Sequence, residues 1–136
     1  MSIIKKYCEA NGVDESRVFN MVVGNRDGVL PLAMGYTGYI TEIKEDSIIC
    51  TNEKLKVKKE IPLSSFKSAE FGIGSGNLWL QCNVDGQPLI FCSPRKSWKS
   101  DAAKLLISKI SEHTEVQGMK EYDRFTGKWF FIFMFK

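Results

Sequence analysis

The sequence predicts a mainly β (α+β) domain in which one helix covers a sheet. Between residues 39 and 91, strand-like runs and turns alternate at the spacing of about 8–12 residues that is typical of a sandwich or barrel. Residues 77–91 have the pattern of a tight hairpin, and residues 98–110 have the single apolar stripe of a helix that packs on a sheet. A chain of 136 residues is expected to form one domain with its own core.

We divide this expected domain into an N-terminal helical segment (1–17), a central part with the strands and the covering helix (18–113), and a tail (114–136) that ends in an aromatic strand. A short helix is predicted over 2–10, because its apolar residues recur at helical spacing and Asn11-Gly12 supplies a stop signal.

Short strands and turns are expected to follow this helix. They are, in chain order, a strand over 18–23, a loop over 24–28, an edge or irregular strand over 29–34, a turn or bulge over 35–38, a hairpin of 39–43 and 47–51, a strand over 55–61, a turn over 62–66 and a strand over 67–71. In the strand over 55–61, Leu55, Val57 and Ile61 are expected to face inward and the lysines outward.

Two glycine-containing loops could bind anions. Residues 24–28 are interpreted as a solvated turn in preference to an anion-binding loop. Residues 72–76 resemble a phosphate loop in composition, but phosphate-binding loops of this kind open a helix, whereas a strand follows here. Residues 72–76 are therefore interpreted as a hairpin connector.

The hairpin over 77–91 has the most specific prediction. Asp85-Gly86 is a strong signal for a type I′ turn, which places Val84 opposite Gln87. This register puts an apolar set on one face, and a shift by one residue would turn the set outward. The apolar set consists of Leu78, Leu80, Cys82, Val84, Leu89 and Phe91. The opposite face carries Trp79, Gln81, Ile90 and Cys92.

One amphipathic helix is expected next. Ser93 is a suitable N-cap with Pro94 in the first helical position, and Ser97 is an alternative cap. The helix should end near His113-Thr114, and the following residues, through Phe125, are polar with a break at Gly118. The apolar stripe consists of Trp98, Ala102, Leu105, Leu106 and Ile110.

The run from Tyr39 to Ile110 resembles the pleckstrin-homology-like (PH-like) superfold in its bacterial or GRAM-like form. The residues that carry this resemblance are Gly38-Tyr39-Ile40-Thr41 with the hairpin strand 47–51, the segment 59–66, the hairpin at Asp85-Gly86, and the helix over 98–110. The resemblance implies a roll of two antiparallel sheets closed by a C-terminal helix, and a role in binding or assembly. It implies no phosphoinositide binding, because the basic signature of that ligand site is not recognisable.

The chemistry-bearing residues do not predict an enzyme, a metal or a cofactor. The four cysteines lack zinc-site spacing and are expected to be small buried residues. The single histidine, His113, is expected near a helix C-terminus, where a cation interacts well with the helix dipole, and no glycine-flanked serine accompanies it. A small enzyme therefore has the least support.

Two groups of residues are candidates for binding. The first is basic: Lys54, Lys56, Lys58 and Lys59, with Lys56 and Lys58 on one strand face, and a second patch of Arg95, Lys96 and Lys99. Together they could contact lipid headgroups or nucleic-acid phosphates, although lysines on a strand edge more often prevent aggregation. A net charge of +3 and the lack of interleaved aromatic residues make nucleic acid a disfavoured partner.

The second group is the aromatic tail between Lys128 and Lys136, whose burial is worth about 1.5–3 kcal/mol per large side chain. Its members are Trp129, Phe130, Phe131, Ile132, Phe133, Met134 and Phe135. We expect it to add a strand to its own sheet, then in order of preference to exchange with a second chain, or to enter a membrane interface.

The sequence thus predicts a non-catalytic PH-like binding or assembly module that contacts a protein partner or a second copy. The alternative is a peripheral membrane protein that uses the tail and the lysines. A cytoplasmic location is expected, because the N-terminal residues lack the pattern of a signal peptide.

Overall fold

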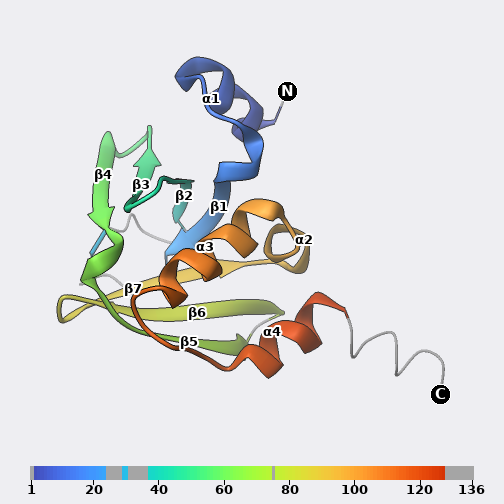
Figure 1. The fold of residues 1–136 in the computed structure, drawn as a ribbon. Coiled ribbons are helices and arrows are strands. Elements are labelled where there is room, and N and C mark those ends of the chain that lie inside the picture. Colours follow the sequence, from blue (N-terminus) through green and yellow to red (C-terminus); the bar gives the residue numbers. More distant parts are fainter. Residues whose placement is uncertain (1, 24–28, 31–36, 75, 128–136) are drawn as a thin grey trace.

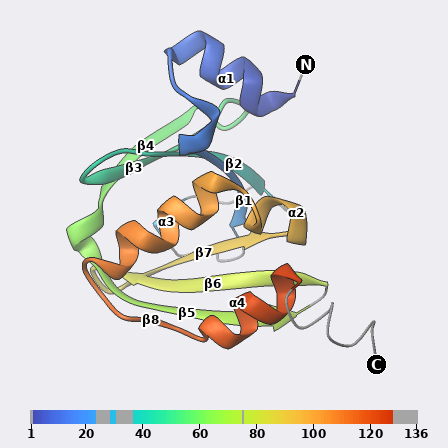
Figure 2. The ribbon, with the colours of Figure 1, turned by 45° about the vertical axis from the view of Figure 1, so that its right-hand side comes forward.

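The computed structural model describes residues 2–23, 29–30, 37–74 and 76–127, which form a mainly β structure with several helices. The strands are connected in the order β4-β3-β2-β1-β7-β6-β5-β8. Neighbours β1 and β7 pair only at Val22 and Cys92, so the sheet divides into two halves of four strands. The halves curve around a shared core (Figures 1 and 2).

The first half is an antiparallel meander preceded by α1 (Ile3–Asn11) and a short 3₁₀ helix, η1 (Glu15–Arg17). Its strands are β1 (Val18–Val23), β2 (Thr37–Ile43), β3 (Ser47–Asn52) and β4 (Val57–Pro62). The predicted N-terminal helix is confirmed: Ser2 caps its first turn, and Gly12 ends it in the left-handed conformation.

The second half begins after a 3₁₀ turn, η2 (Leu63–Ser65). Its strands are β5 (Phe66–Gly74), β6 (Asn77–Val84), β7 (Gln87–Ser93) and the short β8 (Val116–Gln117), which runs parallel to β5. The predicted register of the β6–β7 hairpin is confirmed, from Val84 opposite Gln87 to Leu80 opposite Phe91. Positive φ angles of 51° at Asp85 and 86° at Gly86 fit the type I′ turn.

The prediction of a single helix after β7 is wrong in two respects. The chain forms α2 (Arg95–Trp98) and α3 (Asp101–Ser111), because the Ser100 hydroxyl accepts a hydrogen bond from the Ala103 N–H (3.2 Å) and starts a new helix. Ser93 is not a helix cap: it ends β7, and its hydroxyl donates to the Asn20 carbonyl (2.6 Å). The end of α3 at Ser111 agrees with the prediction.

The core lies where α3 is enclosed by the two halves (Figure 2). Trp98, at the end of α2, is completely buried and donates its indole N–H to the Leu78 carbonyl (2.9 Å). Phe19 from the first half and Phe71 from the second both contact its ring. The Trp98 side chain therefore links both halves of the sheet to the helical layer.

The polar segment after α3 contains a helix that the sequence did not predict: Met119–Thr126 forms α4, and the break expected at Gly118 lies directly before it. Gly118 precedes this helix with φ +76°, and a Cβ there would lie 2.7 Å from the Phe71 carbonyl oxygen. Tyr122 is buried and donates its hydroxyl to the Trp98 carbonyl (2.8 Å). These contacts hold α4 against β5 and α2 despite its polar sequence.

Other expectations need smaller corrections. Thr37 and Gly38 begin β2 and are not a turn, and 72–74 extend β5, so the connector is shorter than predicted. The 3₁₀ turn at 63–65 and the inward side of Ile61 are as predicted. The predicted loop at 24–28, the predicted strand and turn at 31–36 and the aromatic tail fall on residues outside the described part of the chain.

Candidate interaction surfaces

The outer edge of β4 is the clearest accessible main-chain surface. β4 is the terminal strand of its half, and no described strand pairs with its outer side. The Leu63 N–H donates to the Asp46 carbonyl (2.9 Å), and this bond sets the alternation of the β3–β4 ladder. In that alternation, main-chain hydrogen bonds to β3 are made by Val57, Lys59 and Ile61. The main-chain N–H and C=O groups of Lys58 and Glu60 point away from β3.

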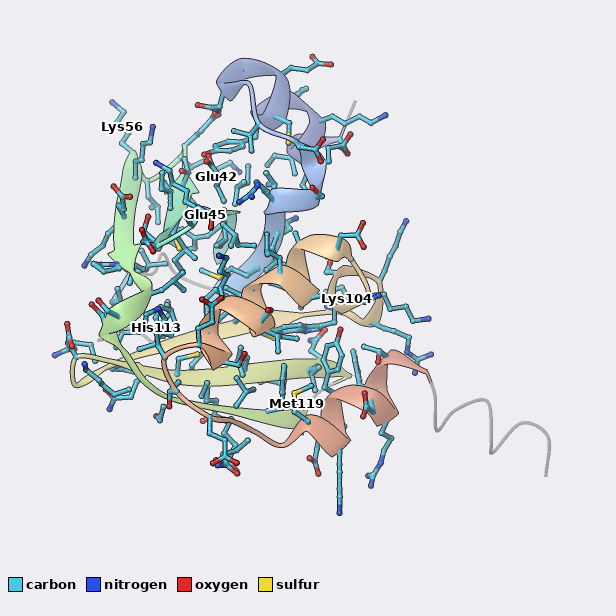
Figure 3. The ribbon with its side chains drawn as sticks, in the orientation of Figure 1. Glu42, Glu45, Lys56, Lys104, His113 and Met119 are labelled. Carbon is cyan, nitrogen blue, oxygen red and sulfur yellow. The ribbon has the colours of Figure 1, made fainter. Side chains whose placement is uncertain are left out.

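The lysines near this edge are arranged differently from the prediction. Lys56 does not share a strand face with Lys58, because it precedes β4 in a turn with φ +55°. The Lys56 N–H donates to the Glu53 carbonyl (3.1 Å), and the Asn52 side chain accepts from the Leu55 N–H (2.9 Å). Lys56 is nevertheless exposed at the same corner of the sheet (Figure 3).

Some of the charged side chains at this corner already have partners. The Lys59 ammonium donates to the Val29 carbonyl (3.1 Å), and Glu60 accepts from the Ser47 hydroxyl (2.6 Å). Lys54, Lys56 and Lys58 are exposed and make no side-chain hydrogen bond or ion pair with any described residue. Three lysines are therefore exposed at this corner.

A hollow of about 310 Å³ lies beside the outer edge of β4. It lies between β4 and the β6–β7 turn. Val29 contacts both sides: its N–H donates to the Pro88 carbonyl (3.0 Å), and its carbonyl accepts from the Lys59 ammonium. The sequence did not predict this hollow, because it depends on which strands end each half of the sheet. Its lining includes Val29, Lys59, Ile61, Val84, Asp85 and Gln87.

The second predicted basic patch does not join the first. α2 and β4 lie on different sides of the molecule in both ribbon views (Figures 1 and 2). Arg95 is engaged in the fold: its Nε donates to the Phe125 carbonyl (2.7 Å), and its guanidinium lies 5.6 Å from the centre of the Phe125 ring. Lys96 and Lys99 are exposed. The seven predicted cations thus form two separate groups.

His113 lies just beyond α3 and is exposed (Figure 3). It borders an open hollow with Ser111, Glu112 and Met119. Within the described part of the chain, its imidazole makes no hydrogen bond to a serine or a carboxylate.

All four cysteines are buried free thiols, in agreement with the sequence. Burial raises the pKa of the Cys50 thiol to about 12 and also raises the pKa of the Cys82 thiol. Cys82 faces Leu89 and Cys92 faces Trp79, so the two are out of register as expected. Over the described ranges, no group of three or more acidic, cysteine or histidine residues could hold a metal ion.

α1 covers the outer face of β2. Its Tyr7 hydroxyl donates to Glu42 (2.8 Å), and Cys8, Val18 and Ile40 form a small apolar cluster beneath it. Burial and the neighbouring Glu42 raise the pKa of Tyr7 to about 12. α1 therefore covers the part of the outer face formed by β1 and β2.

Comparisons with known proteins give no family assignment. No family model matches the chain, and no curated protein is significantly similar to it. Among the described residues, no helix is long and apolar enough to cross a membrane.

Proposed function

We propose that this protein is a non-catalytic PH-like module that binds a protein partner or assembles with a second copy. Two consecutive antiparallel meanders, β1 to β4 and β5 to β7, with α3 enclosed between them, support the PH-like assignment. β8 and α4 are additions to that pattern. The proposal assigns the contact to the outer edge of β4.

The observation behind this assignment is the unpaired side of β4. An extended segment can add to such an edge through main-chain hydrogen bonds, which give affinity without a deep pocket. Lys58 and Glu60 offer their N–H and C=O groups there by the register of the β3–β4 ladder. Lysines suit this role, because they oppose uncontrolled edge pairing while allowing a complementary partner.

The test is a titration of the isotope-labelled full chain with an eight-residue peptide of alternating valine and threonine, followed by NMR. We expect amide shifts centred on Lys58 and Glu60. Glu60→Pro removes an outward N–H but no bond to β3, so it should weaken binding at least fivefold relative to Glu60→Gln, which keeps the N–H. Shifts that avoid β4, or equal affinities for the two variants, would refute this contact.

The tail, Trp129–Phe135, is proposed as an added strand in its own sheet or as an arm exchanged with a second copy. Light scattering on the full chain and on a chain truncated after Lys128 separates these alternatives. Exchange predicts a dimer mass that truncation halves. A monomer mass in both samples contradicts exchange.

A lipid surface is the second candidate function, and the exposed corner of Lys54, Lys56 and Lys58 favours it. Co-sedimentation with phosphatidylglycerol vesicles at low and high salt tests this function. Lipid binding through the lysines requires co-sedimentation that decreases with salt, and its absence counts against a membrane role.

A further inference from the structure

The outer edge of β4 borders two chemically different faces of the sheet, and the hollow lies on the inner one. Side chains alternate across a strand, so Lys58 and Glu60 lie on the outer face with their β3 partners Thr51 and Ile49. Ile61 is buried on the inner face. If a strand were added beside β4, its successive side chains would lie in turn on the inner face and on the outer face of the sheet.

The hollow on the inner side is lined by apolar and polar residues in similar proportion. Ile61 and Val84 are buried and Val29 is half-buried, and all three line the hollow between β4 and the β6–β7 turn. Lys59 also borders it, with its ammonium bonded to the Val29 carbonyl. Apolar side chains of an added strand would gain contacts here that they lack in water.

Three lysines outnumber two carboxylates, Glu53 and Glu60, on the outer side. Glu60 accepts a hydrogen bond from the Ser47 hydroxyl and keeps its negative charge. Lys58 and the nearby turn lysines, Lys54 and Lys56, remain exposed without described partners. Carboxylates on the outer face of an added strand would meet these three cations, and complementary charges select partners and speed association.

We propose that the partner at this edge is an extended protein segment in which acidic and apolar residues alternate. This inference rests on the proposed function and names the chemistry of its partner. The acidic side chains lie beside Lys54, Lys56 and Lys58, and the apolar side chains enter the hollow at Val29, Ile61 and Val84. The main chain of the segment pairs with Lys58 and Glu60.

Three eight-residue peptides test the charge preference on the full chain by fluorescence anisotropy. In each, valine alternates with a second residue: glutamate, threonine or lysine. We expect the glutamate peptide to bind at least tenfold more tightly than the lysine peptide and more tightly than the threonine peptide. Its affinity should fall as the salt concentration rises, because the lysines are exposed.

Two protein variants locate the preference. K54E/K56E/K58E should reduce affinity for the glutamate peptide at least tenfold. K96E/K99E/K104E changes the net charge by the same amount at exposed positions away from β4 (Lys104 in Figure 3). This control variant should change the affinity for the glutamate peptide less than threefold. Equal losses in the two variants would overturn the assignment of the acidic side chains to this corner.

Backbone methylation tests the strand pairing. Only alternate N–H groups of an added strand bond to β4, so one of two glutamate peptides, N-methylated on odd or on even residues, should lose binding. Retained binding by both peptides would overturn strand addition.

The peptide arms also distinguish this inference from the proposed function. Equal binding of the threonine and glutamate peptides would overturn the acidic preference and leave a strand-binding edge. Binding by none of the three peptides would overturn both. Binding to phosphatidylglycerol vesicles without any peptide preference would replace the protein segment with a lipid surface.

Discussion

Replacing Gly118 by alanine should lower the free energy of unfolding, and it should do so by more than the same substitution at a second glycine of similar backbone conformation. Gly118 has φ +76°, and a left-handed conformation costs an alanine roughly 1–2 kcal/mol. An added Cβ would also lie 2.7 Å from the Phe71 carbonyl oxygen. Phe71 is paired with Leu80 inside the β5–β6 ladder, so its backbone has little freedom to move. Overpacking of this kind adds about 1–3 kcal/mol.

Gly76 provides the matched control. Its φ of +77° is nearly identical, but a Cβ there meets nothing within 4 Å. Gly76→Ala should therefore cost only the conformational part, roughly 1–2 kcal/mol, and Gly118→Ala about 2–5 kcal/mol. Urea unfolding of the two variants and the native chain measures both free energies. Equal losses would refute the close approach of Gly118 to β5, and with it the docking of α4.

Three further predictions concern single side chains. Tyr122→Phe leaves the buried Trp98 carbonyl without the Tyr122 hydroxyl, so the free energy of unfolding should fall by about 1–3 kcal/mol in urea; no loss would show that this hydrogen bond contributes nothing net. The hydrogen bond from Lys109 lowers the pKa of Glu45 below its ordinary value of 4.5, so this interaction stabilises the fold above the unfolded-state pKa and is lost as pH falls through the folded-state pKa. Thermal unfolding should distinguish Glu45→Gln from the native chain near pH 6 but no longer at about pH 3, and a constant difference would contradict the ion pair. Burial raises the pKa of Cys50 to about 12, so iodoacetamide at pH 8 should modify Cys50 only after unfolding, and rapid native-state labelling would contradict its burial.

The sequence predicted those elements whose signals are local. The register of the β6–β7 hairpin follows from Asp85-Gly86 and the alternation around it, because the turn and the pattern constrain the same residues. α1 was predicted from the helical spacing of its apolar residues and from Asn11-Gly12, and Gly12 does end the helix.

The missed elements depend on contacts distant in the sequence. α4 is polar overall, and its stability comes from Tyr122 and Phe125 packing against residues more than 20 positions earlier, which no local pattern records. The break between α2 and α3 had a local signal in Ser100, but a serine on the polar face of a helical pattern is compatible with one helix or two.

The candidate site was predicted only in part. The lysines at 54–59 were identified from the sequence, but their relation to the strand was wrong at Lys56, whose positive φ places it in a turn. The strand edge and the hollow beside it require the strand order, which links β1 to β7 across most of the chain. Val29 could not be assigned to the site without that order.

Amide hydrogen exchange in the free protein measures whether the outer edge of β4 is open. If the outer edge is open, the outward N–H groups of Lys58 and Glu60 should exchange rapidly, while those of Lys59 and Ile61, which bond to β3, should be protected. Addition of the alternating valine–glutamate peptide should then protect Lys58 and Glu60. Equal protection of all four amides before any peptide is added would show that the edge is already occupied, and would contradict the account.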